Sequence, residues 1–161
     1  YNMTVDEFHT YFVSDLGIWV HNTNDDACDF GGLIGTDIFK KGTTSNALNH
    51  IFEGEVLKGE AVGFHYEGIP NSRGRIIGNI DSPNTYGVYR ANIEVDGILK
   101  NAKTTFFPKD WTPQQVVDEI NTAFNNSVVY KNNRYRGFAS TGMEIEFILK
   151  KGKITSAYPL Y

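Results

Sequence analysis

The chain has 161 residues, 40% of them hydrophobic and 14% aromatic, which is enough for one domain with a real core plus a small appendage. This composition excludes a disordered chain, and no apolar run approaches the roughly 18–20 residues that a membrane-spanning helix needs. A single cysteine, Cys28, excludes an internal disulfide, so the fold must rest on its core. The chain begins without methionine and without a basic leader, and we expect it to be part of a longer protein.

The net charge of −4 is unevenly distributed along the chain. Seven of the 19 acidic residues but only two of the 15 basic residues precede residue 50, which leaves the remainder at +1. A near-neutral domain can bind RNA through a local basic groove, although it does not bind RNA indiscriminately. The charge therefore permits a nucleic-acid partner without pointing to one.

The first 45 residues divide into two stretches. Residues 1–22 alternate polar and apolar side chains around a glycine-bearing turn at 14–17, which predicts a hairpin. Residues 23–45 are rich in Asn, Asp, Gly and Thr and show no period, which predicts a linker with at most one short helical turn. Residue 46 begins a folded domain, and its first element is a short helix over 47–51 that Ser45 or Asn46 would cap.

Strand patterns dominate the rest of the chain. Residues 76–80 and 86–95 alternate as strands, and the dipeptide Asp96-Gly97 predicts a tight turn into a returning strand over 98–107. Thr112-Pro113 predicts the start of a helix that ends at 125–126. A final hairpin pairs 143–149 with 154–158 across a turn at 151–153. We therefore predict an α+β fold with mostly antiparallel strands.

Two of the four histidines, His50 and His65, flank a loop with Gly54, Gly59 and Gly63. Attack of an RNA 2′-hydroxyl on its own phosphate needs a base and an acid, and two imidazoles with an ordinary pKa of about 6.5 can supply both. The glycines would let backbone N–H groups approach a phosphate oxygen, and a lysine would stabilise the charge of the transition state. On spacing alone, two such histidines are more often surface residues or core residues with satisfied hydrogen bonds.

The block from His50 to Glu55, followed by Gly63-Phe64-His65, resembles the two-histidine signature of the EndoU endoribonucleases. This family includes eukaryotic poly-U-specific endoribonucleases and a coronavirus uridylate-specific endoribonuclease. Further motifs extend the resemblance over residues 46–161. A lysine stands six residues before Phe106, a small hydroxyl residue follows it, and the ending resembles the family's C-terminal hairpin, in which a Ser or Thr two places before a Tyr contacts the uridine.

The resemblance implies an EndoU/RNase A-like arrangement without a metal or other cofactor. Its catalytic residues would be His50, His65 and Lys100, and its substrate-binding residues would be Gly63, Thr104, Ser156 and Tyr158. Apart from the resemblance, Thr141 lies in a glycine-flanked loop and is a further candidate RNA contact. We expect His65 to be the base and His50 the acid, and the reverse assignment stays open. Lys103 would lie on the opposite strand face from Lys100, so that only one of them would line the site.

Residues 1–22 resemble the end of a pretoxin HINT domain, an intein-like module, with His21-Asn22 as its cleavage pair. Alternatively, His21-Asn22 only ends a hairpin. The implied layout is a HINT remnant at 1–22, a linker at 23–45 and a nuclease domain at 46–161.

Together the two resemblances imply the toxic C-terminal domain of a bacterial contact-dependent growth inhibition or polymorphic toxin. Such a secreted or cell-surface effector is delivered into the cytoplasm of a target cell and is neutralised in its maker by a cognate immunity protein. The resemblance implies cleavage of RNA, with tRNA near a uridine as the leading substrate, to a 2′,3′-cyclic phosphate. Two alternatives remain: a non-catalytic binding module of a secreted or adhesin protein, and a metal-dependent RNA hydrolase.

Overall fold

The computed structural model describes residues 30, 32–43 and 46–161. The hairpin and the HINT remnant expected in residues 1–22 lie outside the described residues. The helices and strands, in chain order, are α1 (Ala47–Phe52), β1 (Glu55–Leu57), β2 (Glu60–Val62), β3 (Gly74–Asp81), β4 (Tyr89–Val95), β5 (Ile98–Leu99), β6 (Thr104–Phe106), α2 (Pro113–Asn125), β7 (Val128–Lys131), β8 (Arg134–Phe138), β9 (Glu144–Lys150) and β10 (Lys153–Pro159). All pairings between these strands are antiparallel, which confirms the predicted α+β class.

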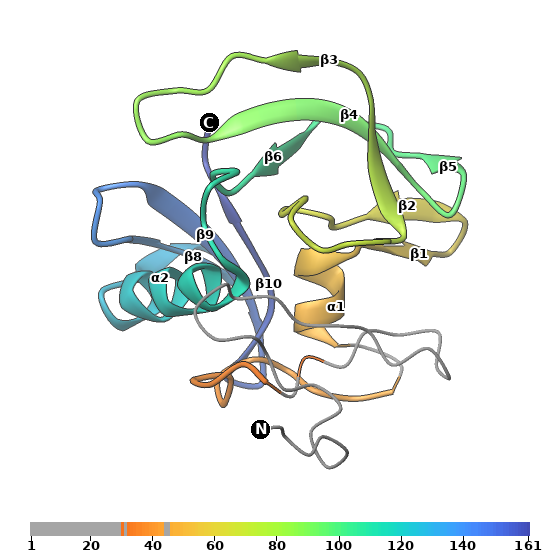
Figure 1. Cartoon of the computed structure of the whole chain (residues 1–161). Helices are drawn as coiled ribbons and strands as arrows, with labels where there is room; N and C mark the ends of the chain where they lie inside the picture. Colours follow the sequence, from red (N-terminus) through yellow and green to blue (C-terminus); the bar gives the residue numbers. More distant parts are fainter. Residues whose placement is uncertain (1–29, 31, 44–45) are drawn as a thin grey trace, which may run out of the picture.

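The molecule has two halves, which Figure 1 shows one above the other. The lower half is the sheet β10-β9-β8-β7, with α2 packed against β8 and β9 and α1 packed against β10. The upper half contains the sheet β3-β4-β5, with β6 also paired to β4, and the small sheet β1-β2. Contacts between β6 and β10 join the halves, and the site described below lies at this junction.

Both helices begin where the sequence predicts. The side chain of Thr112 caps α2 in a reciprocal capping box with Gln115, and Pro113 occupies the first helical position. Of the two caps expected for α1, the structure describes Asn46, whose side chain accepts a hydrogen bond from the backbone of Asn49. A cap of this kind stabilises a helix by about 1 kcal/mol.

The turn predicted at Asp96-Gly97 is confirmed. Both residues have positive φ angles, 52° and 83°, as a two-residue hairpin turn of this type requires. The single returning strand predicted over 98–107 is wrong, because β5 ends at Leu99 and β6 begins at Thr104. Both strands pair with β4, but the chain between them has two residues more than the facing stretch of β4, so residues 100–103 leave the sheet as a loop.

Two apolar cores correspond to the two halves. In the smaller core, alternate residues of β4 (Tyr89, Ala91, Ile93 and Val95) are buried with Phe106, the period-two pattern of a strand with one buried face. The larger core lies among α1, α2 and β8 to β10. It includes Phe30 and Phe39, which precede the expected domain start.

The described part of the expected linker packs on the domain. Phe39 forms a parallel bridge with Ile154, the backbone N–H of Lys40 donates to the carbonyl of Ile154 at 2.8 Å, and the N–H of Ile154 donates to the carbonyl of Ile38 at 2.8 Å. The aromatic residue in an otherwise polar stretch explains the attachment, since its burial stabilises the ordered segment by about 1.5–3 kcal/mol. The domain boundaries themselves stay predictions.

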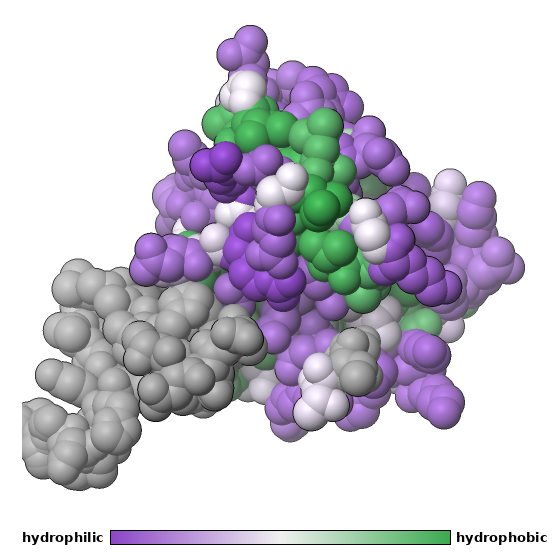
Figure 2. Space-filling model, turned by 90° about the vertical axis from the view of Figure 1, so that its right-hand side faces the viewer, coloured by the Kyte–Doolittle hydropathy of each residue, from purple (hydrophilic) through white to green (hydrophobic). Residues whose placement is uncertain are grey.

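The face that carries β1, β2 and β5 shows a band of apolar side chains among polar ones (Figure 2). The exposed apolar residues on these strands are Leu57, Ile98 and Leu99. Among the described residues, no helix has the length and apolar character needed to cross a membrane.

Candidate active site

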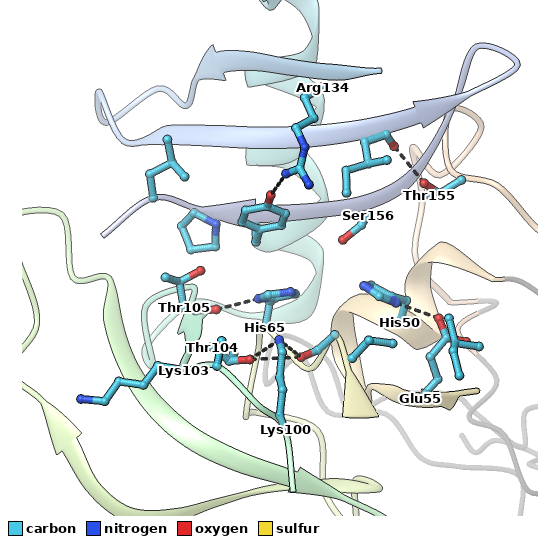
Figure 3. Close-up of a pocket in the computed structure, with 18 residues that line it drawn as sticks. His50, Glu55, His65, Lys100, Lys103, Thr104, Thr105, Arg134, Thr155 and Ser156 are labelled. Atoms are coloured by element: carbon cyan, nitrogen blue, oxygen red, sulfur yellow. Dashed lines mark hydrogen bonds and ion pairs between the residues drawn. The ribbon is translucent and has the colours of Figure 1, made fainter. Parts of the chain in front are cut away.

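A cavity of about 660 Å³ lies between the two halves, with residues of α1, β8, β9 and β10 from the lower half and residues of β1, β2, β6 and the loop before β6 from the upper half. Figure 3 shows the side chains of His50, His65 and Lys100 converging there from three separate segments. The expected site residues that line this cavity are His50, Gly63, His65, Lys100, Thr104, Ser156 and Tyr158. The structure does not bring Thr141 to it, since Thr141 lies in the loop between β8 and β9.

His65 is held as a neutral imidazole. It is only 6% exposed, and its Nδ1–H donates to the backbone carbonyl of Thr105 at 2.8 Å. Burial, followed by the positive charges of Lys100 and His50, lowers its pKa well below 6.5, and the opposing effect of the Thr105 bond is smaller. With the proton on Nδ1, Nε2 keeps a lone pair at neutral pH and can accept a proton.

His50 stands in the last turn of α1 and faces His65. The centroids of the two rings are 6.2 Å apart. The Nδ1 of His50 lies 2.7 Å from a carboxylate oxygen of Glu55 on β1, which fixes the ring and leaves Nε2 as the nitrogen that can act on a substrate. A carboxylate on Nδ1 also favours a donor N–H at that nitrogen.

The chain after β2 folds back over the end of α1 and thereby brings the second histidine to the first. The backbone N–H of Phe64 donates to the carbonyl of His50 at 2.8 Å, and that of His65 donates to the carbonyl of Ile51 at 2.6 Å. These bonds satisfy carbonyls that the helix itself leaves unpaired. Gly63 makes the close approach possible: its φ is 81°, and a Cβ there would lie 2.2 Å from the carbonyl oxygen of His50.

Lys100 is held in the cavity by two oxygen atoms. Its Nζ donates to the hydroxyl of Thr104 at 2.5 Å and to the carbonyl of Gly63 at 3.4 Å. An ammonium group has three donors, so one is left for a substrate oxygen. Burial lowers the pKa of Lys100 to about 8, and the side chain is still mostly charged at pH 7. Thr104, only 1% exposed, therefore serves to position Lys100.

Lys103 also borders the cavity, but it points away from the histidines (Figure 3). Its Nζ forms an ion pair with Asp81 at 2.9 Å. The expectation that opposite strand faces would separate Lys100 from Lys103 is wrong, because residues 100–103 form a loop. The ion pair with Asp81 separates the two ammonium groups instead.

An irregularity in β10 turns Ser156 and Tyr158 toward the cavity. The pairing register of β9 and β10 shifts between Ile154 and Ser156, as in a β-bulge. Ile154 and Ala157 both face the core, whereas Ser156 and Tyr158 line the cavity. The ring of Tyr158 stacks on His65 with centroids 5.2 Å apart. Tyr158 thus lies beside His65, and its expected contact with the uridine stays a prediction.

Residues 44–161 match the family model described as bacterial EndoU nuclease. The chain belongs to this family. A protein named Toxin from Bacillus cereus is 45% identical over 120 residues, which cover 71% of this chain and 22% of that protein. The chain therefore spans about a fifth of the length of this curated relative. No solved structure matches the chain.

Three charged residues of this EndoU nuclease were missed by the sequence analysis: Glu55, Arg134 and Glu146. Arg134 lines the cavity and donates to the hydroxyl of Tyr158 at 2.9 Å and to Glu146 at 2.7 Å. Burial, followed by the hydrogen bond and charge of Glu146, raises the pKa of Tyr158 to about 12, so its hydroxyl keeps its proton. The sequence signal for the contact between Arg134 and Glu146 was the alternation of Arg residues on β8 and Glu residues on the neighbouring strand β9.

Glu146 is the centre of this network. It is buried and accepts hydrogen bonds from Arg134, Arg136 and the hydroxyl of Tyr158. Burial alone would raise its pKa, but the bonds to Tyr158, Arg136 and Arg134 outweigh burial and lower it. The EndoU nuclease thus fixes Tyr158 against His65 with a charged group that stays ionised. In the described part of the chain, no group of three or more His, Cys, Asp or Glu residues could hold a metal ion.

Proposed function

We propose that this nuclease domain cleaves RNA by transphosphorylation and leaves a 2′,3′-cyclic phosphate and a 5′-hydroxyl. The observation that carries the proposal is the convergence of two imidazoles, with ring centroids 6.2 Å apart, and one ammonium group in a single cavity. Two proton-transfer groups at this separation can serve the attacking and the leaving oxygen of one phosphate.

The geometry favours His65 as the base and His50 as the acid. The Nε2 of His65 takes the proton from the ribose 2′-hydroxyl, and the 2′ oxygen then attacks phosphorus. The bond from phosphorus to the 5′ oxygen breaks, and Nε2–H of His50 gives its proton to that oxygen. The lowered pKa of His65 supports its role, because a base must be unprotonated at the start of the reaction. Glu55 supports the role of His50, because its contact with Nδ1 at 2.7 Å orients the ring and leaves Nε2 free to face the 5′ oxygen.

Lys100 stabilises the negative charge that develops on the phosphorane, using its remaining N–H donor. Removing one such donor commonly costs a factor of about 10²–10³ in rate. Because side chains of this protein supply every step, we propose a metal-independent reaction.

We propose that the nucleotide beside the scissile phosphate is a uridine, held by Ser156 and Tyr158. One face of the Tyr158 ring packs on His65. The uracil ring would therefore contact the rest of the Tyr158 ring and the hydroxyl of Ser156. A tRNA loop is the proposed target, because an unpaired loop presents a splayed base to a cavity of this size.

We further propose that this domain is the toxic part of a larger secreted or cell-surface effector. Its support is the 45% identity to a protein named Toxin and the small share of that protein that the match covers. The same proposal includes delivery into a target cell, neutralisation by a cognate immunity protein and an upstream HINT remnant at residues 1–22. So do a linker at 23–45 and a nuclease domain that starts near residue 46.

The deciding experiment incubates the purified chain with total bacterial RNA and maps the fragment ends. We expect a 2′,3′-cyclic phosphate on one side of each cut, a 5′-hydroxyl on the other and a uridine at the cut. His50→Ala and His65→Ala should lose cleavage while the circular dichroism spectrum is unchanged. Wild-type cleavage by either variant would exclude the proposed site, and loss of activity in excess EDTA would exclude the metal-independent scheme.

A further inference from the structure

Five lysines gather at the turn between β9 and β10. Lys150, Lys151 and Lys153 lie in or beside this turn, and Lys40 and Lys41 come from the segment before α1. Together with Phe39 and Asp37 they surround a cavity of about 500 Å³, separate from the one that holds the histidines. We call these five lysines the lysine cluster.

Backbone contacts build the cluster from two distant parts of the sequence. Residues 38–40 run beside the start of β10 through two hydrogen bonds with Ile154, each of 2.8 Å. The Nζ of Lys153 donates to the backbone carbonyl of Asp37 at 2.7 Å, which ties the two segments together. The packing of Phe39 therefore brings Lys40 and Lys41 to the turn although more than 100 positions separate them in sequence.

The charge of the cluster is mostly uncompensated. None of its five lysines forms an ion pair within the described residues, whereas Lys103 and Lys109 do. Asp37 is the one carboxylate that lines the cavity. In a chain of net charge −4, five neighbouring ammonium groups make a local field that attracts anions with several negative charges.

Strand β10 contributes residues both to the lysine cluster and to the cavity that holds the histidines. Ile154 faces the core, so Lys153 lies on the outer face of β10, the face on which the bulge also places Ser156 and Tyr158. The three steps along the strand from Lys153 to Ser156 cover about 10 Å. Phosphates in a stacked nucleic-acid strand are spaced by about 3.4 Å along its axis, so this length corresponds to roughly three nucleotides.

We propose that the lysine cluster binds the sugar–phosphate backbone of the RNA substrate about three nucleotides from the cleaved bond. This inference rests on the proposed function and adds a second contact region to it. Lysines act on phosphates as point charges and carry no sequence information, so the cluster would contribute affinity, while the cavity around His65 selects the base.

The test compares Lys150→Gln/Lys151→Gln with Lys109→Gln/Lys131→Gln, which removes the same charge elsewhere. The first pair leaves the Lys153 bond to Asp37 intact, so the fold should be unaffected. In chains that also carry His65→Ala, binding of a single-stranded uridine-rich RNA of about 12 nucleotides is measured over a salt series. We expect the cluster variant to bind roughly tenfold more weakly at low salt, with a salt slope shallower by about 1.4.

Cleavage assays separate this proposal from the proposed function. With an intact His65, the cluster variant should raise KM for the long RNA and leave kcat/KM for a uridine-containing trinucleotide unchanged, because the trinucleotide reaches only the histidine cavity. Equal behaviour of the cluster and control variants would overturn the proposal. It would also be overturned if RNA binding were normal and only binding to the cognate immunity protein were lost. Absence of cleavage by the wild-type chain would instead refute the proposed function.

Discussion

Replacing Lys100 with methionine is expected to stabilise the fold while removing most of the activity. Burial lowers the pKa of Lys100 from 10.5 to about 8, which means that the folded state disfavours the charged form. This difference corresponds to about 3 kcal/mol of lost stability at pH 7. Methionine has a similar length and no charge, but it forfeits the hydrogen bonds to Thr104 and Gly63, each contributing about 1 kcal/mol. The net gain should be about 1–2 kcal/mol.

The pH dependence of the same variant provides a sharper measurement. Between about pH 8 and pH 10.5 the unfolded chain still binds the Lys100 proton that the folded chain has released, so wild-type stability rises with pH in this window. Lys100→Met lacks this rise. Relative to the variant, the wild type should therefore gain about 2 kcal/mol between pH 7 and pH 9.5.

Urea unfolding of both chains at the two pH values, followed by circular dichroism, measures this difference directly. Other titrating groups are common to both chains and cancel in the comparison. A variant less stable than the wild type at pH 7, combined with a difference that does not change with pH, would refute the burial of a charged ammonium at this site. Such a result would mean that Lys100 lies in solvent.

Other variants test the remaining contacts of the site. The cleavage rate of the wild type should fall above about pH 8 as Lys100 loses its proton. Lys100→Arg should keep a larger fraction of its neutral-pH rate at pH 9.5 than the wild type does. A wild-type rate that stays constant to pH 10 would contradict a charged Lys100 in the reaction. Gly63→Ala should cost at least about 1–2 kcal/mol from its left-handed backbone, with a larger loss of activity because the new Cβ displaces His50; a wild-type midpoint in thermal unfolding would disprove this. Glu146→Gln should lower the stability by about 2 kcal/mol and raise KM through loss of Tyr158 orientation, measured by urea unfolding and steady-state kinetics. The lowered pKa of Glu146 means that its contribution is present at neutral pH and is lost as the pH falls through that value, so the variant and the wild type should converge in acid.

Local patterns predicted much of the fold because their causes are local. A capping residue with proline placed the start of α2, and Asp96-Gly97 placed a turn whose positive φ angles few other residues adopt readily. The period of two in β4 predicted its buried face. The sequence could not show that the return strand breaks after Leu99, because the break depends on how many residues of β4 are available for pairing.

The candidate site was likewise predictable only in part. His50, His65 and Lys100 were recognisable from residue type and family motif, and the structure brings all three to one cavity. Thr141 does not line this cavity, and the sequence could not show this, because a glycine-flanked loop carries no pattern that indicates the direction in which it faces. Arg134 and its bond to Tyr158 were not foreseen, since the partner lies 24 residues away on a different strand.

The order of the elements, the caps, the tight turns and the chemical identity of the candidate catalytic groups could be predicted from the amino-acid sequence, because each of these depends on residues close together in the chain. The neutral state of His65, the lowered pKa of Lys100 and the approach of Lys40 to the turn between β9 and β10 follow from the packing of the folded chain. These properties depend on desolvation and on the field of charges that are distant in sequence. Both arise when chain segments pack together and exclude water.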